Sequence, residues 1–162
     1  MAEFKPTFDW LKQRPLCLLA FGFGSGLAPV APGTFGTMAA LPIAFLLVLI
    51  GIDGWILAFL CVALFMWGIR ICNHTEKALG IQDYGGIVWD EMVAMLLILA
   101  FAPFKWNWWL AAFILFRLID SIMPWPIEGF DRQVHGGFGI MLDDIIAAIM
   151  TLIVLGIAAW II

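Results

Sequence analysis

The chain has 162 residues, of which 64% are hydrophobic and 12% charged, with a net charge of −4 and a mean hydropathy of +1.05. Soluble domains are about 45–50% apolar and about 25% charged, so this composition excludes an ordinary soluble domain and indicates a membrane protein. No basic stretch with interleaved aromatic residues indicates a nucleic-acid partner. Cys17, Cys61 and Cys72 form neither a zinc-type cluster nor a cysteine-phosphatase motif.

The N-terminal segment, residues 1–15, mixes aromatic side chains with basic ones and ends at Pro15. This mixture predicts an amphipathic segment on the cytoplasmic membrane surface. Residues 16–27 (LCLLAFGFGSGL) are apolar but few, and they include three glycines. A spanning helix needs about 20 apolar residues, so we expect this stretch to be re-entrant or interfacial.

Five longer apolar runs follow, near residues 34–50, 54–72, 87–103, 106–123 and 138–162. They predict an all-α membrane protein in which residues 16–162 form one domain, a compact bundle of about five transmembrane helices. Cytoplasmic loops carry most Lys and Arg residues. With the N-terminus inside and five spans, only Lys105 among the basic residues lies outside, and the C-terminus is outside.

Two pairs of adjacent acids interrupt the apolar runs: Asp90 with Glu91, and Asp143 with Asp144. Charges inside membrane segments mark functional sites by default. The predicted topology places both pairs, together with Asp120, near the cytoplasmic interface. Oxygen ligands of this kind suit Mg2+, so we expect all five acids to be metal ligands or catalytic groups. Small residues one turn further on, Ala94 and Ala147–Ala148, would let the helices approach closely.

Arg117 and Asp120 are three residues apart and share a helical face. They can form a local salt bridge, and Arg117 can also grip a phosphate while Asp120 binds metal; these interpretations are compatible. As an alternative to a metal site, the acids could be structural partners of Arg117 and Arg132. Two arginines do not balance five acids, which favours the metal site.

The glycine-rich stretch GFGSGLAPVAPGT exposes backbone N–H groups and resembles a phosphate cradle, with a flexible bend as the alternative. Its expected substrate-binding residues are Gly24, Ser25, Gly26 and Thr34. His135 precedes the last run and could protonate a leaving group or contact phosphate. His74 and Asp83 have the character of ordinary loop residues.

Four blocks in order carry a family resemblance: GFGSGLAPVAPGTFGT at 22–37, IVWDE at 87–91, FRLIDSIMPWPI at 116–127 and FDRQVHGGFGIMLDD at 130–144. Together they resemble the phosphatidylglycerophosphatase A family of bacterial membrane lipid phosphatases. Met123 departs from the pattern, which commonly has Lys there. The resemblance implies Mg2+-dependent hydrolysis of phosphatidylglycerophosphate to phosphatidylglycerol in the bacterial cytoplasmic (inner) membrane, with the site facing the cytoplasmic leaflet.

The expected chemistry is metal-assisted phosphomonoester hydrolysis, in which Arg117 and Arg132 neutralise developing charge. The division of the acids into ligands and base stays open, and so does a covalent aspartyl intermediate. The rival function is a small ion- or proton-coupled transporter that uses the buried carboxylates. Transporter sites lie near the bilayer midplane, whereas these acids are expected near one interface. The pattern does not specify an oligomeric state.

Overall fold

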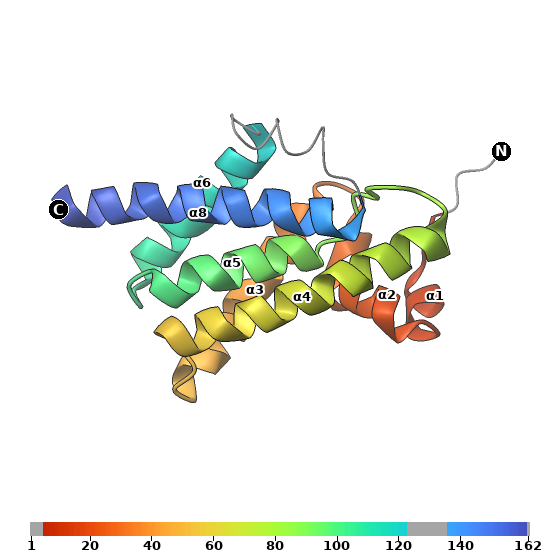
Figure 1. Ribbon diagram of the computed structural model, residues 1–162, viewed down its shortest axis with the longest axis horizontal. Coiled ribbons are helices and arrows are strands. Elements are labelled where there is room, and N and C mark those ends of the chain that lie inside the picture. Colours follow the sequence, from red (N-terminus) through yellow and green to blue (C-terminus); the bar gives the residue numbers. More distant parts are fainter. Residues whose placement is uncertain (1–4, 123–135, 162) are drawn as a thin grey trace.

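A computed structural model describes residues 5–122 and 136–161, and within these ranges all regular structure is helical (Figure 1). Arg132 and His135 lie outside the described residues, so their predicted roles stay predictions. The elements in chain order are α1 (Phe8–Lys12), α2 (Pro15–Ala20), the 3-10 helix η1 (Gly22–Leu27), α3 (Pro32–Leu49), α4 (Gly54–Leu79), α5 (Trp89–Phe101), α6 (Trp106–Ile122) and α8 (Gly137–Ile161). The expected all-α membrane fold is confirmed.

Helix length separates complete spans from shorter helices. Within the described residues, α3, α4 and α8 are long and apolar enough to cross a membrane, at 18, 26 and 25 residues. Helix α5 has 13 residues, or about 20 Å at 1.5 Å per residue, against about 30 Å of hydrocarbon. The structure therefore supports three spans by length and composition, and the expected number of about five is not confirmed.

Helix α5 lies at the centre of the bundle, where it packs against α3, α4, α6 and α8 (Figure 1). Ten of its 13 residues are buried. Ala94 on α5 and Ala148 on α8 are fully buried, and Ala147 is 1% exposed. Helices α5 and α8 pack together, and the burial of these small residues agrees with the expected close approach of the two helices.

Helix α4 continues seven residues beyond the apolar run that predicted it, to Leu79. The predicted boundary near residue 72 was wrong because Glu76, Lys77 and their neighbours are good helix formers despite their polarity. The helix ends at Gly80, whose φ of 70° and ψ of 17° give the left-handed conformation that suits glycine after a helix. This extension brings Glu76 next to the following loop.

The segment between Pro15 and Leu27 folds as two short elements, and neither α2 nor η1 is long enough to span. Within η1 the chain kinks at Phe23 and Gly24, which both have positive φ. Helix α2 packs against α4, and η1 packs against α3. Thr7 is the N-cap of α1, because its Oγ1 accepts a hydrogen bond from the Trp10 amide at 3.3 Å. Helix α1 packs on both α2 and η1.

Candidate active site

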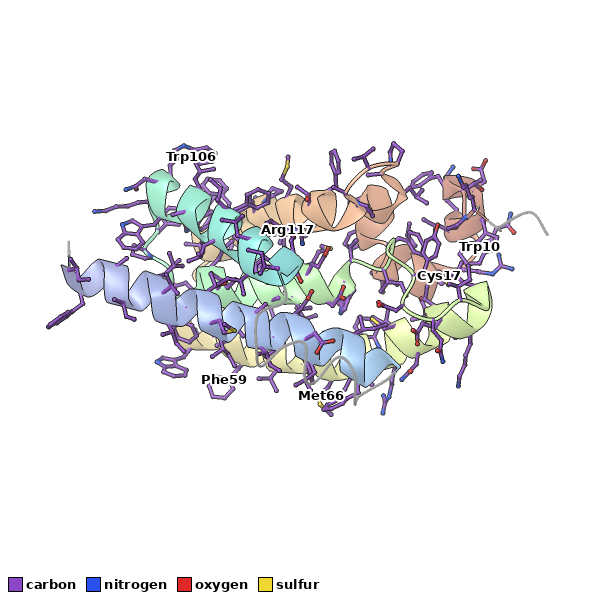
Figure 2. The ribbon with its side chains drawn as sticks, turned by 90° about the horizontal axis from the view of Figure 1, so that it is seen from above. Trp10, Cys17, Phe59, Met66, Trp106 and Arg117 are labelled. Carbon is purple, nitrogen blue, oxygen red and sulfur yellow. The ribbon has the colours of Figure 1, made fainter. Side chains whose placement is uncertain are left out.

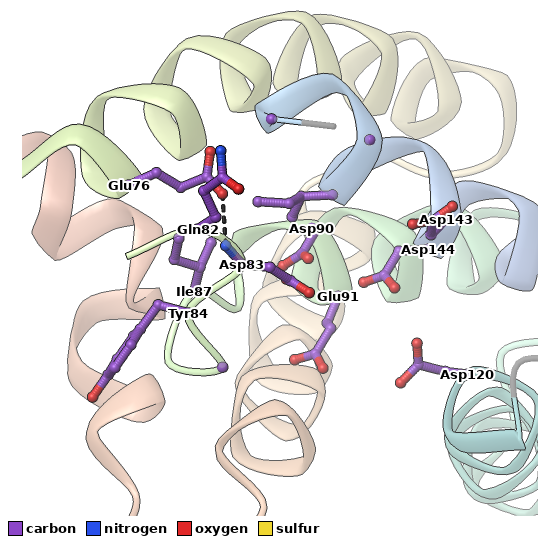
Figure 3. A pocket seen from close by; sticks show the side chains of 14 residues that line it. Glu76, Gln82, Asp83, Tyr84, Ile87, Asp90, Glu91, Asp120, Asp143 and Asp144 are labelled. Carbon is purple, nitrogen blue, oxygen red and sulfur yellow. Dashed lines mark hydrogen bonds between the residues drawn. The ribbon is translucent and has the colours of Figure 1, made fainter. Parts of the chain in front are cut away.

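A cavity of about 400 Å3 lies where α5 and α8 begin and α6 ends (Figure 3). Its wall contains seven carboxylates from α4, the loop before α5, and helices α5, α6 and α8: Glu76, Asp83, Asp90, Glu91, Asp120, Asp143 and Asp144. The structure thus brings together all five acids that the sequence singled out. Both members of each adjacent pair line the cavity, although neighbouring residues diverge by about 100° around a helix.

Backbone and side-chain contacts fix the helix ends that carry these acids. Asp90 and Glu91 occupy the first turn of α5, where the positive end of the helix dipole favours negative charge. Just before them, the Val88 amide donates to the Ala20 carbonyl at 2.8 Å. At the start of α8, the Gly137 amide donates to Asn73 Oδ1 at 2.8 Å. The acids are therefore held on helix ends that are tied to α2 and α4.

Arg117 joins two of the acids. Its Nη1 lies 3.0 Å from Glu91 Oε1 and 2.8 Å from Asp120 Oδ2. The predicted pair with Asp120 is confirmed, and the longer-range pair with Glu91 is an addition that spacing along the sequence could not reveal. Arg117 lies on the α6 side of the bundle (Figure 2) and is not among the described residues that line the cavity. Its immediate role is to orient Glu91 and Asp120, and its predicted contact with phosphate stays a prediction.

Several carboxylate oxygens in the cavity wall are buried without a donor. Asp90 is 9% and Asp144 6% exposed. Among the described residues, Asp90 Oδ1, Glu91 Oε2 and Asp144 Oδ2 have no hydrogen-bond partner. Burying a carboxylate is costly unless it is paired or binds a cation. Arg117 pairs with Glu91 and Asp120, whereas Asp90 and Asp144 form no ion pair within the described part of the chain, so no protein cation there neutralises these two buried carboxylates.

These oxygens fit a hard cation by their chemistry. Over residues 5–122 and 136–161, no three His, Cys, Asp or Glu groups form a ready-made metal cluster. Mg2+ does not need one, because it is usually held by one or two carboxylates and takes water and substrate phosphate as its other ligands. Asp90 and Asp144 are the best placed to supply such ligands, since neither has an ion-pair partner in the same ranges.

Glycine at position 33 makes room for Glu91. A Cβ atom built on Gly33 would overlap Glu91 Oε1 and would lie 2.6 Å from its Cδ and 2.7 Å from Oε2. Gly33 stands in the first turn of α3, and its carbonyl accepts the Thr37 hydroxyl at 2.8 Å. The glycine-rich stretch therefore does contact the acids, but through a residue that the sequence did not single out.

The predicted phosphate-cradle residues lie elsewhere. A Cβ on Gly24 would lie 3.1 Å from the Phe8 ring, and Ser25 Oγ donates to the Gly22 carbonyl at 2.9 Å. Gly26 packs against the Gly86 carbonyl, and the Thr34 amide donates to Ala31 at 2.9 Å. In the described ranges none of the four lines the acidic cavity. A phosphate-binding role for them stays a prediction.

Glu76 and Gln82 line the cavity although the sequence did not single them out, and Asp83, interpreted from the sequence as an ordinary loop residue, lines it too. Glu76 Oε1 accepts the Asp83 amide at 2.7 Å, which stabilises the turn where Asp83 has a φ of 48°. Gly80 could have revealed Glu76, because a glycine often follows the last residue of a helix. A helix that ends just before Gly80 has Glu76 in its last turn, facing the next loop.

Comparison with known proteins identifies the family. The model of the family described as phosphatidylglycerophosphatase A matches residues 18–159. The chain belongs to the phosphatidylglycerophosphatase A family. It is 46% identical to phosphatidylglycerophosphatase A of Escherichia coli K12 over 141 residues, which cover 86% of this chain and 80% of the relative. The Haemophilus influenzae protein of the same name is 43% identical over 157 residues, covering 95% and 94%.

A more distant relative from Bacteroides thetaiotaomicron is 36% identical over 152 residues, which cover 90% of this chain and 94% of the relative. It is provisionally named a phosphatidylinositol-3-phosphatase. No solved structure matches the chain. Membership of the phosphatidylglycerophosphatase A family makes this protein a phosphatase enzyme embedded in membrane.

Proposed function

We propose that the protein hydrolyses the terminal phosphomonoester of phosphatidylglycerophosphate and releases phosphatidylglycerol and inorganic phosphate, with Mg2+ as cofactor. The observation that carries this proposal is the convergence of seven carboxylates on one cavity in a member of this family. A dianionic phosphate could not enter such a cavity unless cations offset the acids. A divalent cation that binds carboxylate and phosphate together meets this requirement.

Mg2+, when bound, would polarise the phosphoryl oxygens and offset their charge. Asp90 and Asp144 would hold it through their buried oxygens, which lack other partners in the described chain. Glu91 has one oxygen fixed by Arg117 and leaves Oε2 without a donor there. We assign Glu91 Oε2 to orient the attacking water and take its proton. As the water oxygen bonds to phosphorus, the bond to the glycerol oxygen breaks, and that oxygen takes up a proton.

The rival transporter function is disfavoured by the position of the acids and by family membership. The carboxylates line a cavity at one end of the bundle, whereas transporter sites usually lie near the bilayer midplane. The relative named for a phosphatidylinositol phosphate also suggests a lipid phosphomonoester. We therefore include phosphatidylinositol 3-phosphate as a second substrate in the test.

The decisive assay measures phosphate release from phosphatidylglycerophosphate in mixed micelles, with Mg2+ and then with EDTA. We expect release with Mg2+ and its loss with EDTA. Asp144→Asn and Asp90→Asn should each lower kcat by roughly 100-fold or more, since they remove buried groups at the reacting centre. Asp53→Asn is the matched control, because Asp53 precedes the first residue of α4, is exposed and makes no side-chain capping hydrogen bond.

Three results would count against the proposal, and a fourth would change its preferred substrate. An absence of phosphate release from phosphatidylglycerophosphate would reject the substrate. Release that is unchanged by EDTA would reject the cofactor alone. Near-normal kcat in folded Asp144→Asn and Asp90→Asn proteins would reject the site. Faster release from phosphatidylinositol 3-phosphate would reassign the preferred headgroup.

We also propose that the cavity faces the cytoplasmic leaflet of the bacterial inner membrane. The support is the expected excess of basic residues on the cytoplasmic side. Lys77 follows the cavity residue Glu76, whereas Lys105, the only basic residue expected outside, lies at the turn between α5 and α6. Cysteines introduced as Lys77→Cys and Lys105→Cys can be treated in intact cells with a reagent that does not cross membranes. Labelling at Lys105→Cys alone is expected, and labelling at Lys77→Cys alone would invert the topology.

A further inference from the structure

A second cavity, of about 410 Å3, adjoins the acidic one. It is lined by Lys5 and Pro6 of the N-terminal segment, by residues 26–29 and 32 at the end of η1 and the start of α3, and by the loop at residues 84–86. Tyr84 and Gly85 line both cavities. The Tyr84 ring packs on Phe21 with the ring centres 5.8 Å apart, and its hydroxyl points away from Asp90 and Glu91 (Figure 3). Tyr84 therefore forms a fixed part of the wall between the two cavities.

The two cavities have opposite chemistry. The acidic cavity contains seven carboxylates, whereas the described lining of the second contains no Asp or Glu and one cation, Lys5. Lys5 has no ion-pair partner among the described residues, in contrast to Lys12, whose Nζ lies 3.2 Å from Asp9. The amides of Gly85 and Gly86 also donate no hydrogen bond to another described residue. Lysine and free amides together provide donors for an anion.

The proposed substrate carries two phosphate groups joined by glycerol, a terminal monoester and a diester to the lipid. Any cation at the acidic cavity is already used for the monoester, so a second phosphate beside the same carboxylates would be repelled. The diester therefore needs a neighbouring place that offers a positive charge. The second cavity shares a wall with the first and provides that charge through Lys5.

We propose that the Lys5 cavity binds the phosphodiester of the lipid substrate while the monoester occupies the acidic cavity. This inference rests on the proposed function and extends it: Lys5 becomes a specificity-determining residue that selects lipids with a diester beside the phosphate to be removed. The same chemistry would attract a free phosphate ion, so the test must separate the two ligands.

The test compares Lys5→Gln and Lys5→Arg with the control Lys12→Gln, whose lysine lines neither cavity. Hydrolysis of phosphatidylglycerophosphate is followed in neutral micelles at fixed salt. Lys5→Gln should raise KM roughly tenfold and leave kcat within about twofold. The lost charged hydrogen bond would stabilise the bound substrate and the transition state equally, so its removal weakens binding without slowing the chemical step. Lys5→Arg should retain most of the affinity, and Lys12→Gln should behave as wild type.

A binding measurement makes the result independent of catalysis. Equilibrium binding of phosphatidylglycerol, which has the diester and lacks the monoester, should weaken roughly tenfold in Lys5→Gln and stay unchanged in Lys12→Gln. Inorganic phosphate binding should depend on Lys5 less strongly than phosphatidylglycerol binding does. A wild-type protein that binds phosphatidylglycerol through Lys5 but releases no phosphate would reject the proposed function and keep the subsite.

Other outcomes overturn the subsite. Unchanged KM and unchanged phosphatidylglycerol binding in Lys5→Gln would exclude a role for Lys5. Equal losses of lipid affinity in Lys5→Gln and Lys12→Gln would show that both lysines act only through a general attraction between basic residues and an anionic surface. Inorganic phosphate binding that depends on Lys5 as strongly as phosphatidylglycerol binding does would assign the cavity to a free anion instead of a lipid diester.

Discussion

Gly33→Ala tests whether the packing of α3 against Glu91 sets the geometry of the acidic cavity. The three heavy atoms nearest to the added Cβ all belong to Glu91, and the overlap forces that side chain or α3 to shift. Overpacking of this kind costs about 1–3 kcal/mol. For a chain of this length, that corresponds to a fall in Tm of roughly 2–12 °C. Glu91 cannot move freely, because its Oε1 is 3.0 Å from Arg117 Nη1.

The functional loss should exceed the stability loss. Displacing a catalytic carboxylate by about 1 Å can lower the rate roughly 100-fold. We therefore expect kcat for phosphate release to fall by about that factor in detergent-solubilised Gly33→Ala protein. Gly156→Ala is the matched control, since a Cβ there meets nothing within 4 Å. It should leave kcat unchanged, and Tm should stay the same or rise slightly.

A double-mutant cycle isolates the contact. In a Glu91→Ala background the obstructing atoms are absent, so adding Gly33→Ala should cost little further stability. The difference between the two backgrounds gives the Gly33–Glu91 coupling, expected at about 1–3 kcal/mol. If Gly33→Ala lowers Tm equally in both backgrounds, the close approach of Gly33 to Glu91 is not what destabilises the variant.

Three further predictions concern Arg117, Gly26 and the cysteines. Arg117→Ala should destabilise the protein by about 3 kcal/mol, because it leaves Glu91 and Asp120 without their shared partner; a chemical-denaturation midpoint equal to wild type would contradict this. Gly26→Ala should lower Tm more than Gly156→Ala, since its Cβ would overlap the Gly86 carbonyl and backbone cannot rotate away; equal Tm values would argue against that packing. The cysteines, all buried, should react with maleimide only after unfolding; rapid labelling of the folded protein would show that a cysteine is accessible.

The sequence predicted an all-helical protein in which five acids lie close together. The apolar runs predicted the helices, and the distribution of basic residues placed all five acids at the same depth in the membrane. It could not predict which glycine approaches the acids. Gly33 and Gly26 belong to the same motif, yet one faces Glu91 and the other faces Gly86. That choice depends on how α3 and η1 dock, which local spacing does not encode.

Hydropathy also misplaced the end of α4. The apolar run stops near residue 72, but backbone hydrogen bonding continues through polar helix formers to Leu79. Glu76 and the loop at Asp83 consequently belong to the cavity wall. The pair between Arg117 and Glu91 was equally hidden, because the two residues lie on different helices and their contact depends on how α5 and α6 pack.

The central position of α5 has a practical consequence for biochemistry. Only about a third or less of the spanning windows of α3, α4 and α8 is buried inside the protein, whereas ten of the 13 residues of α5 are. Extraction into detergent exchanges the medium around the three long helices, but the surroundings of α5 are other parts of the same chain. The setting of Asp90 and Glu91 is therefore expected to survive solubilisation, so that rates measured in micelles report on the site as it exists in the bilayer.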